Sequence, residues 1–153
     1  MLRSRNHSLG FAERTRKNLA LVEGSFAQAA DVHVVTQIAN SLLGLIVFPC
    51  GRNFVGGAAN LQMSELLEHG WPQWEITLGY AHTLGQLVRR LRNATAHGRM
   101  SFSSDSRHPE KVYIEVEDFR PRESEPFWRS RIKASELRTF CLKFIDLIDQ
   151  KVG

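Results

Sequence analysis

Apolar positions recur at steps of three and four along the first part of the chain, from Ser8 to about Gln28. The positions that repeat in this way are Phe11, Thr15, Leu19, Val22 and Phe26. This spacing places them on one face of an α-helix, and the Ser8 hydroxyl can cap its first turn. The pattern therefore predicts an amphipathic helix over about residues 8–28.

The segment from Val32 to Phe48 contains no formally charged residue and predicts a second helix, which begins after Asp31 and ends at Phe48–Pro49. Four polar residues interrupt it, namely Thr36, Gln37, Asn40 and Ser41. Its length of about 17 residues is at the bottom of the range for a membrane span. We therefore expect the most buried helix of a bundle and no association with a membrane.

The middle of the chain predicts a loop over 49–59, a short helix containing Met63 that ends near Gly70, and a longer helix from about Thr77 to His97. The apolar stripe of the longer helix consists of Tyr80, Leu84, Leu87, Val88, Leu91 and Thr95. Gly98 follows at the position where a glycine commonly ends a helix.

After Gly98 the pattern changes to short strands. Residues 101–103 and 112–116 predict two strands separated by a polar turn, 118–126 predict an exposed loop, and 127–132 predict a further strand. A last helix is expected from Ser135 to Lys151. The predicted fold is mainly α, a bundle of about five helices with a small β-hairpin inserted before the last helix. One domain spans 1–153, with residues 1–7 flexible and 99–132 forming the hairpin and loop insertion.

Composition favours a protein of the reducing cytoplasm. The two cysteines, Cys50 and Cys141, are far apart and form no C-x-x-C motif, which argues against a disulfide framework or a zinc site. Buried apolar thiols are the simpler interpretation. The N-terminus lacks the continuous apolar stretch of a secretory signal. We expect no metal and no cofactor.

Positive charge is concentrated in two places. The net charge is +4, and its surplus lies in residues 1–20 and in residues 89–100, where Arg89, Arg90, Arg92 and Arg99 occur without any acidic residue. Such a stretch suits a partner that carries phosphate groups. The alternative is that basic residues simply favour the C-terminal end of a helix.

The basic stretch also contains the pattern R-x(4–6)-H. With fifteen Arg and six His in the chain, about two matches are expected by chance, and two occur, from Arg92 and from Arg90 to His97. The spacing alone therefore carries no weight. Asn93 and His97 are four residues apart and share one helical face, whereas Arg92 lies about 140° around the helix from His97.

These side chains suit cleavage of RNA without a metal. A neutral imidazole at His97 can take a proton from a ribose 2′-OH or from water. The Arg92 guanidinium can bind a phosphate through two hydrogen bonds and stabilise the charge of the transition state. The Asn93 amide can orient either the histidine or the phosphate.

A family resemblance adds to this interpretation. The segment Leu91-Arg92-Asn93-Ala94-Thr95-Ala96-His97-Gly98 resembles the RNxxxH signature of HEPN domains. Two further strings, one from Phe11 to Leu19 and one from Val35 to Pro49, resemble the plasmid- and phage-associated HEPN-family nucleases. The resemblance covers about residues 8–150. It implies a helical bundle, metal-independent endoribonuclease activity, and a homodimer in which two Arg/His sets form one shared cleft.

Other polar residues are candidates for contacts with RNA. Arg89, Arg90 and Arg99 are expected to bind the RNA backbone, with a solvated helix face as the alternative. Gln37 and Asn40 line the cleft beside His97 or else make an interhelical hydrogen bond. Arg14 and Asn18 are further candidates from the first helix. Trp71, Trp74 and Trp128 either stack on bases or fill the core.

The leading hypothesis is an endoribonuclease that acts as a toxin or as an anti-phage or plasmid-maintenance effector, with catalytic residues Arg92, Asn93 and His97. The first alternative is a non-catalytic HEPN module that binds RNA or a protein. The second is a structural subunit whose basic helix end binds an acidic antitoxin.

Overall fold

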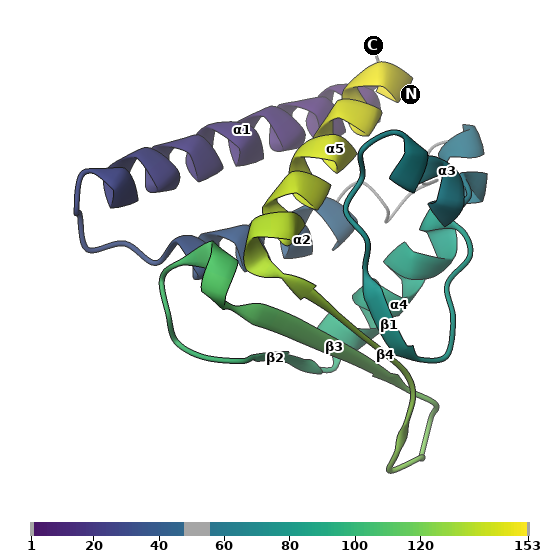
Figure 1. The fold of residues 1–153 in the computed structure, drawn as a ribbon. Helices are drawn as coiled ribbons and strands as arrows, with labels where there is room; N and C mark the ends of the chain where they lie inside the picture. The colour runs from purple at the N-terminus through teal and green to yellow at the C-terminus, as the bar shows by residue number, and fades with distance from the viewer. Residues whose placement is uncertain (1, 48–55, 153) are drawn as a thin grey trace.

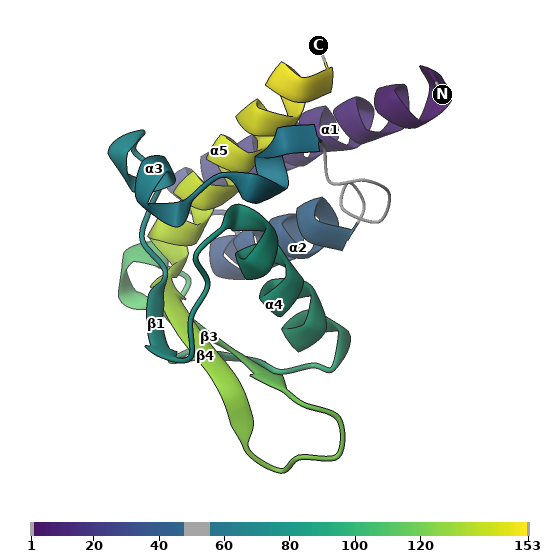
Figure 2. The same cartoon turned by 90° about the vertical axis from the view of Figure 1, so that its right-hand side faces the viewer.

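The computed structural model describes residues 2–47 and 56–152. Its helices gather on one side of a four-stranded antiparallel sheet (Figures 1 and 2). Alternate residues of the two central strands are buried, so the sheet presents one face to the helices. The predicted mainly helical fold is confirmed, but the sheet is larger than the expected hairpin.

Three helices pack against one another. They are α1 (Leu2–Ala27), α2 (Val34–Val47) and α5 (Ala134–Val152), and each contacts the other two. Helix α1 begins before the predicted start at Ser8 and so takes in residues 2–7, whose flexibility remains a prediction. The expected end of the second helix at Phe48–Pro49 lies outside the described residues.

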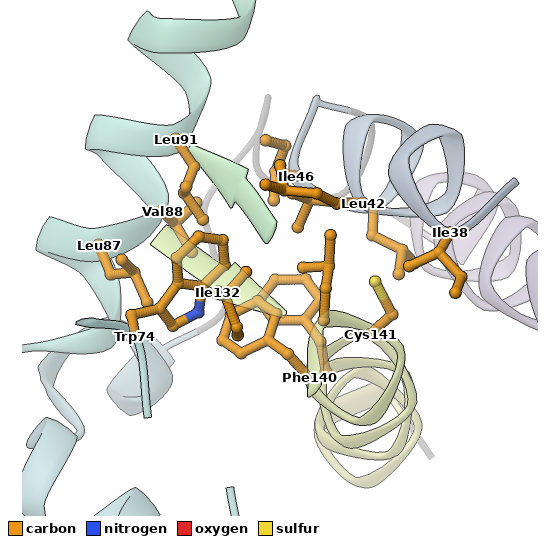
Figure 3. Packing of buried hydrophobic residues seen from close by; sticks show 14 of the residues in the cluster. Ile38, Leu42, Ile46, Trp74, Leu87, Val88, Leu91, Ile132, Phe140 and Cys141 are labelled. Atoms are coloured by element: carbon orange, nitrogen blue, oxygen red, sulfur yellow. The ribbon is translucent and has the colours of Figure 1, made fainter. Parts of the chain in front are cut away.

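The core lies between α2, α5, the sheet and a fourth helix, α4 (Leu84–Ala96) (Figure 3). Ile38, Leu42 and Ile46 of α2 point toward Phe140 and Cys141 of α5. The apolar stripe of α4 packs from the other side. The predicted burial of the second helix is confirmed, because the spacing of its apolar residues covers most of its circumference.

The four strands are β1 (Glu75–Leu78), β2 (Met100–Phe102), β3 (Tyr113–Phe119) and β4 (Pro126–Lys133), in the order β1-β4-β3-β2. The prediction of an exposed loop over 118–126 is wrong at both ends, because β3 continues to Phe119 and β4 begins at Pro126. Pairing between β3 and β4 runs from Tyr113–Lys133 to Phe119–Pro126. Residues 120–125 form the connection.

The prediction of a helix from Thr77 is also wrong. Residues 75–78 instead pair with β4, and α4 begins only after Thr83, whose side chain accepts a hydrogen bond from the backbone N–H of Gln86 at 3.2 Å. Gly79 has a φ of 76°, which a helix does not allow. Tyr80, expected in the core stripe, is 64% exposed.

The remaining elements are short. They are a 3-10 helix, η1 (Gly56–Asn60), the α-helix α3 (Met63–Glu68) and a second 3-10 helix, η2 (Pro109–Lys111). The short helix around Met63 was predicted. Most of the predicted 49–59 loop lies outside the described residues. Over the residues that the structure describes, no helix combines the length and apolar character needed to cross a membrane.

Candidate functional site

The C-terminal end of α4 is fixed by its backbone. Gly98 has a φ of 65°, the Gly98 N–H donates to the Thr95 carbonyl at 3.1 Å, and the Arg99 N–H donates to the Ala94 carbonyl at 2.8 Å. These two bonds form a Schellman motif, which satisfies carbonyls that a helix end leaves free. His97 is the C-cap residue, with φ −104° and ψ 11°. The histidine therefore lies on an ordered turn.

The solvent face of α4 carries the predicted catalytic residues. Arg89, Arg92, Asn93 and His97 are all exposed, on the side away from the buried stripe. That stripe consists of Leu84, Leu87, Val88, Leu91 and Ala94. It contains Ala94 in place of the expected Thr95, whose hydroxyl donates to the Arg92 carbonyl at 3.1 Å.

The helical spacing separates Arg92 from His97 within one chain. Asn93 and His97 are one turn apart, and the His97 N–H donates to the Asn93 carbonyl at 3.3 Å. Arg92 lies about 140° around the axis from His97. Among the described residues, the side chains of Arg92 and His97 make no hydrogen bond or ion pair. Both are therefore available to a ligand.

A buried carboxylate contacts this site from the sheet. Asp118 of β3 is only 3% exposed, and its Oδ2 accepts from Asn93 Nδ2 and from Arg90 Nη1, each at 3.3 Å. Asp118 lies on the same face of β3 as the buried Ile114 and Val116, because alternate residues of a strand share a face. Its carboxylate is therefore on the face that packs against α4. Asp118 thus links the sheet to the candidate catalytic helix.

The contact with Asp118 fixes the orientation of the Asn93 amide. A carboxylate oxygen accepts hydrogen bonds, so the NH₂ group of Asn93 faces Asp118. The Asn93 carbonyl oxygen is then the group left for another donor. A protonated imidazole nitrogen or a ribose hydroxyl has the donor that this oxygen needs.

The basic residues around α4 have different environments. Arg90 is paired with Asp118, and its guanidinium lies over the Phe127 ring at 4.6 Å. The Arg99 guanidinium lies over the Phe119 ring at 4.2 Å. Arg89 makes no such contact with the described residues. The charge of Arg90 is therefore balanced within the protein, and Arg89 and Arg92 are more open to a phosphate.

Gln37 and Asn40 line a hollow between α1 and α2. It has a volume of about 240 Å³ and is lined by Arg14, Thr15, Asn18, Gln37, Asn40 and Ser41. Those residues come from α1 and α2, and none from α4. The structure therefore brings Arg14 and Asn18 to the two amides, but it does not bring the two amides to His97 within one chain.

Other candidates are placed in the core. Trp71, Trp74 and Trp128 are buried, which excludes stacking on RNA bases in this fold. Burial raises the pKa of the Cys141 thiol to about 12, so it is protonated near neutral pH and is a poor nucleophile. Cys50 lies outside the described residues. The described residues contain no group of three or more His, Cys, Asp or Glu side chains that could hold a metal ion.

Asp118 is the site residue that sequence reasoning missed. The signal was present in the alternation of Tyr113-Ile114-Glu115-Val116-Glu117-Asp118, which places a carboxylate on the apolar face if the strand continues. The stretch 89–100 contains no acidic residue of its own, but the fold supplies one from β3.

One family model matches the chain. The family model described as HEPN pEK499 p136 matches residues 1–153. No curated protein and no solved structure matches the chain. Because the family model covers the whole sequence, including both helix strings and the RNxxxH segment, the chain belongs to the HEPN pEK499 p136 family.

Proposed function

We propose that the chain is a metal-independent endoribonuclease whose catalytic residues are Arg92, Asn93 and His97. HEPN-family domains are known for ribonuclease activity. The observation that carries the proposal is the exposed His97 on an ordered helix end, one turn after an Asn93 amide that Asp118 holds. The proposed setting is the cytoplasm, where the protein acts as a toxin or as an anti-phage or plasmid-maintenance effector.

The proposed roles follow from the groups present. His97 removes the proton of the attacking hydroxyl, and Arg92 stabilises the charge that develops on the phosphate. If the ribose 2′-OH attacks, its oxygen bonds to phosphorus while the bond from phosphorus to the 5′-oxygen breaks. The 5′-oxygen gains a proton, and the products are a 2′,3′-cyclic phosphate and a 5′-hydroxyl end. Asn93 accepts a hydrogen bond that orients His97 or the ribose.

The site is proposed to be completed in a homodimer. Arg92 and His97 are separated by about 140° on one helix, so a phosphate beside His97 is poorly placed for Arg92 of the same chain. A twofold axis near the exposed face of α4 would bring each Arg92 toward the other subunit's histidine. Arg89 and Arg99 are proposed contacts for the RNA backbone, and Arg90 contributes less because Asp118 neutralises it.

The proposal is tested by incubating mixed RNA with the protein in EDTA. Substituting His97→Ala is expected to lower the cleavage rate by about 10²–10⁴-fold, because it removes the general base. Substituting Arg92→Ala is expected to lower it by about 10²–10³-fold. His82→Ala is the matched control, since His82 is also exposed but stacks on Tyr80 at 4.8 Å, away from α4's C-terminal end.

The rates must be compared among variants of equal thermal stability. Cleavage that survives both substitutions at α4 would refute the catalytic assignment. Absence of cleavage by the wild type, with RNA binding retained in a gel shift, would favour a non-catalytic RNA-binding module. Binding of an acidic antitoxin protein in place of RNA would favour the structural-subunit alternative.

A further inference from the structure

A polar hollow lies between α1 and α2, which otherwise pack against each other through apolar residues. The α1–α2 hollow, as we call it, is the 240 Å³ space lined by Arg14, Thr15, Asn18, Gln37, Asn40 and Ser41. Arg14 and Asn18 are four residues apart on α1, and Gln37 and Ser41 are four residues apart on α2. Each pair therefore lies on one helical face.

The hollow has a closed floor and an open rim. Thr15 is 8% and Ser41 3% exposed, and they form the floor. Arg14, Asn18 and Asn40 are exposed and form the rim, with Gln37 half-buried between them. Buried Leu19 and Ile38 on the same two helices continue the apolar core on either side. The polar faces thus interrupt a helix contact where apolar side chains would pack more favourably.

Four of the described side chains around the hollow have unused hydrogen-bonding groups. Within the part of the chain that the structure describes, the side chains of Arg14, Asn18, Gln37 and Asn40 make no hydrogen bond or ion pair. The contrast with Arg16 on the same helix is clear, since Arg16 Nη2 binds Asp146 at 2.8 Å and Asp149 at 3.3 Å. Among the described residues that line the hollow there is no carboxylate, so none of them repels an anion.

We propose that the α1–α2 hollow is a second RNA-binding site, which holds a segment of the single-stranded substrate away from His97. The Arg14 guanidinium binds a phosphate, and the amides of Asn18, Gln37 and Asn40 bind base edges or ribose hydroxyls. The inference rests on the proposed function in that RNA is the ligand, but it does not require cleavage.

The size and chemistry of the hollow favour a polymer over two other ligands. Pockets that enclose small molecules usually measure about 300–1,000 Å³, and this hollow is smaller and open at the rim. Obligate protein interfaces have apolar centres, whereas the described residues of this lining contribute one guanidinium, three amides and two hydroxyls. When an RNA strand crosses the hollow, only one phosphate and the edge of one nucleoside have to fit into it.

The test measures binding of a labelled single-stranded RNA by fluorescence anisotropy over a series of salt concentrations. The full chain carrying His97→Ala is used throughout, so that RNA is not cleaved during the titration. In this background Arg14→Gln is expected to weaken binding by about tenfold, and to reduce the slope of log K against log salt by about 0.7, the contribution of one phosphate contact.

Two further variants separate this site from general attraction. Lys17→Gln removes the same charge from an exposed position of the same helix that does not line the hollow. This variant is expected to weaken binding by at most about twofold to threefold. Asn40→Ala is expected to weaken binding by about threefold to tenfold without changing the salt slope, because an amide releases no counterion.

The outcomes are distinct. Equal effects of Arg14→Gln and Lys17→Gln would overturn the proposal, because the chain would then attract RNA only through its overall charge. A change in molecular mass by light scattering in Arg14→Gln or Asn40→Ala would also overturn it, since the hollow would then be a protein interface. Failure of the ribonuclease assignment appears separately, as cleavage that survives His97→Ala.

Discussion

At the scale of single residues, Asp118 has the least expected position. A carboxylate on the core face of a strand loses its hydration and needs donors to offset that cost. The donors are Asn93 and Arg90, both on α4. Removing the charge at Asp118 should therefore affect two quantities, namely the free energy of unfolding and the orientation of the Asn93 amide.

We predict that Asp118→Asn lowers the cleavage rate by about tenfold to a hundredfold, because a misoriented Asn93 no longer holds its hydrogen-bonding partner in position. The rate is measured alone and in combination with Asn93→Ala. If Asp118 acts through Asn93, the effect on rate disappears in the Asn93→Ala background, while the loss of stability remains.

The matched control for this cycle is Glu117→Gln. Glu117 precedes Asp118 on β3, is half-buried on the opposite side of the strand, and binds Arg129 at 2.9 Å. It is expected to leave the cleavage rate within about twofold of wild type. An Asp118→Asn effect that is equally large with and without Asn93 would mean that Asp118 supports only the fold.

The sequence was sufficient to predict that Arg92, Asn93 and His97 lie outside the apolar stripe of α4, because they belong to one periodic helix with a terminating glycine. It was not sufficient to predict the contact of Asn93 with Asp118. That contact joins residues 25 positions apart in the chain and depends on where β3 ends and which face its last residues occupy. Local periodicity does not determine either.

At the scale of elements, β1 is the strand that sequence analysis missed. Thr77, Tyr80 and Leu84 follow the spacing of a helix, and the segment between them is too short to show a strand alternation. Residues 75–78 form a strand instead, because they pair with β4 and because the positive φ of Gly79 ends any helix at that point. The second and last helices were predicted well because their apolar faces extend over several turns.

We predict that Gly79→Ala destabilises the protein by about 2–4 kcal/mol, from its positive φ and from a steric clash. A Cβ at this position would lie 2.8 Å from the Phe127 carbonyl oxygen. The free energy of unfolding is measured by urea denaturation. Gly24→Ala is the control, since a Cβ there meets nothing within 4 Å; in a helix it should stabilise by about 0.5–1 kcal/mol.

An unchanged free energy of unfolding in Gly79→Ala would show that the turn after β1 tolerates a side chain. The junction of β1 with β4 would then be less constrained than the structure indicates.

At the scale of the whole molecule, the proposed homodimer has a direct test. Arg92→Ala and His97→Ala variants are mixed and refolded together, and cleavage is measured. If each site combines Arg92 of one subunit with His97 of the other, half of the dimers are mixed and one of their two sites is intact. Activity of about a quarter of wild type is then expected.

Two results would contradict this arrangement. Recovery of no activity, although light scattering shows that mixed dimers form, would place a complete site within each chain. A monomer mass at micromolar concentration would exclude a shared site. In either case Arg92 would have to reach a phosphate beside His97 along its own helix.

The burial of all three tryptophans has a practical consequence for these measurements. Trp71, Trp74 and Trp128 are at most 8% exposed, and none lies on α4 or in the α1–α2 hollow. Their fluorescence should therefore respond to global unfolding and remain almost constant when RNA binds. One optical signal thus reports the folded fraction of every variant in the same cuvette in which a labelled RNA reports occupancy.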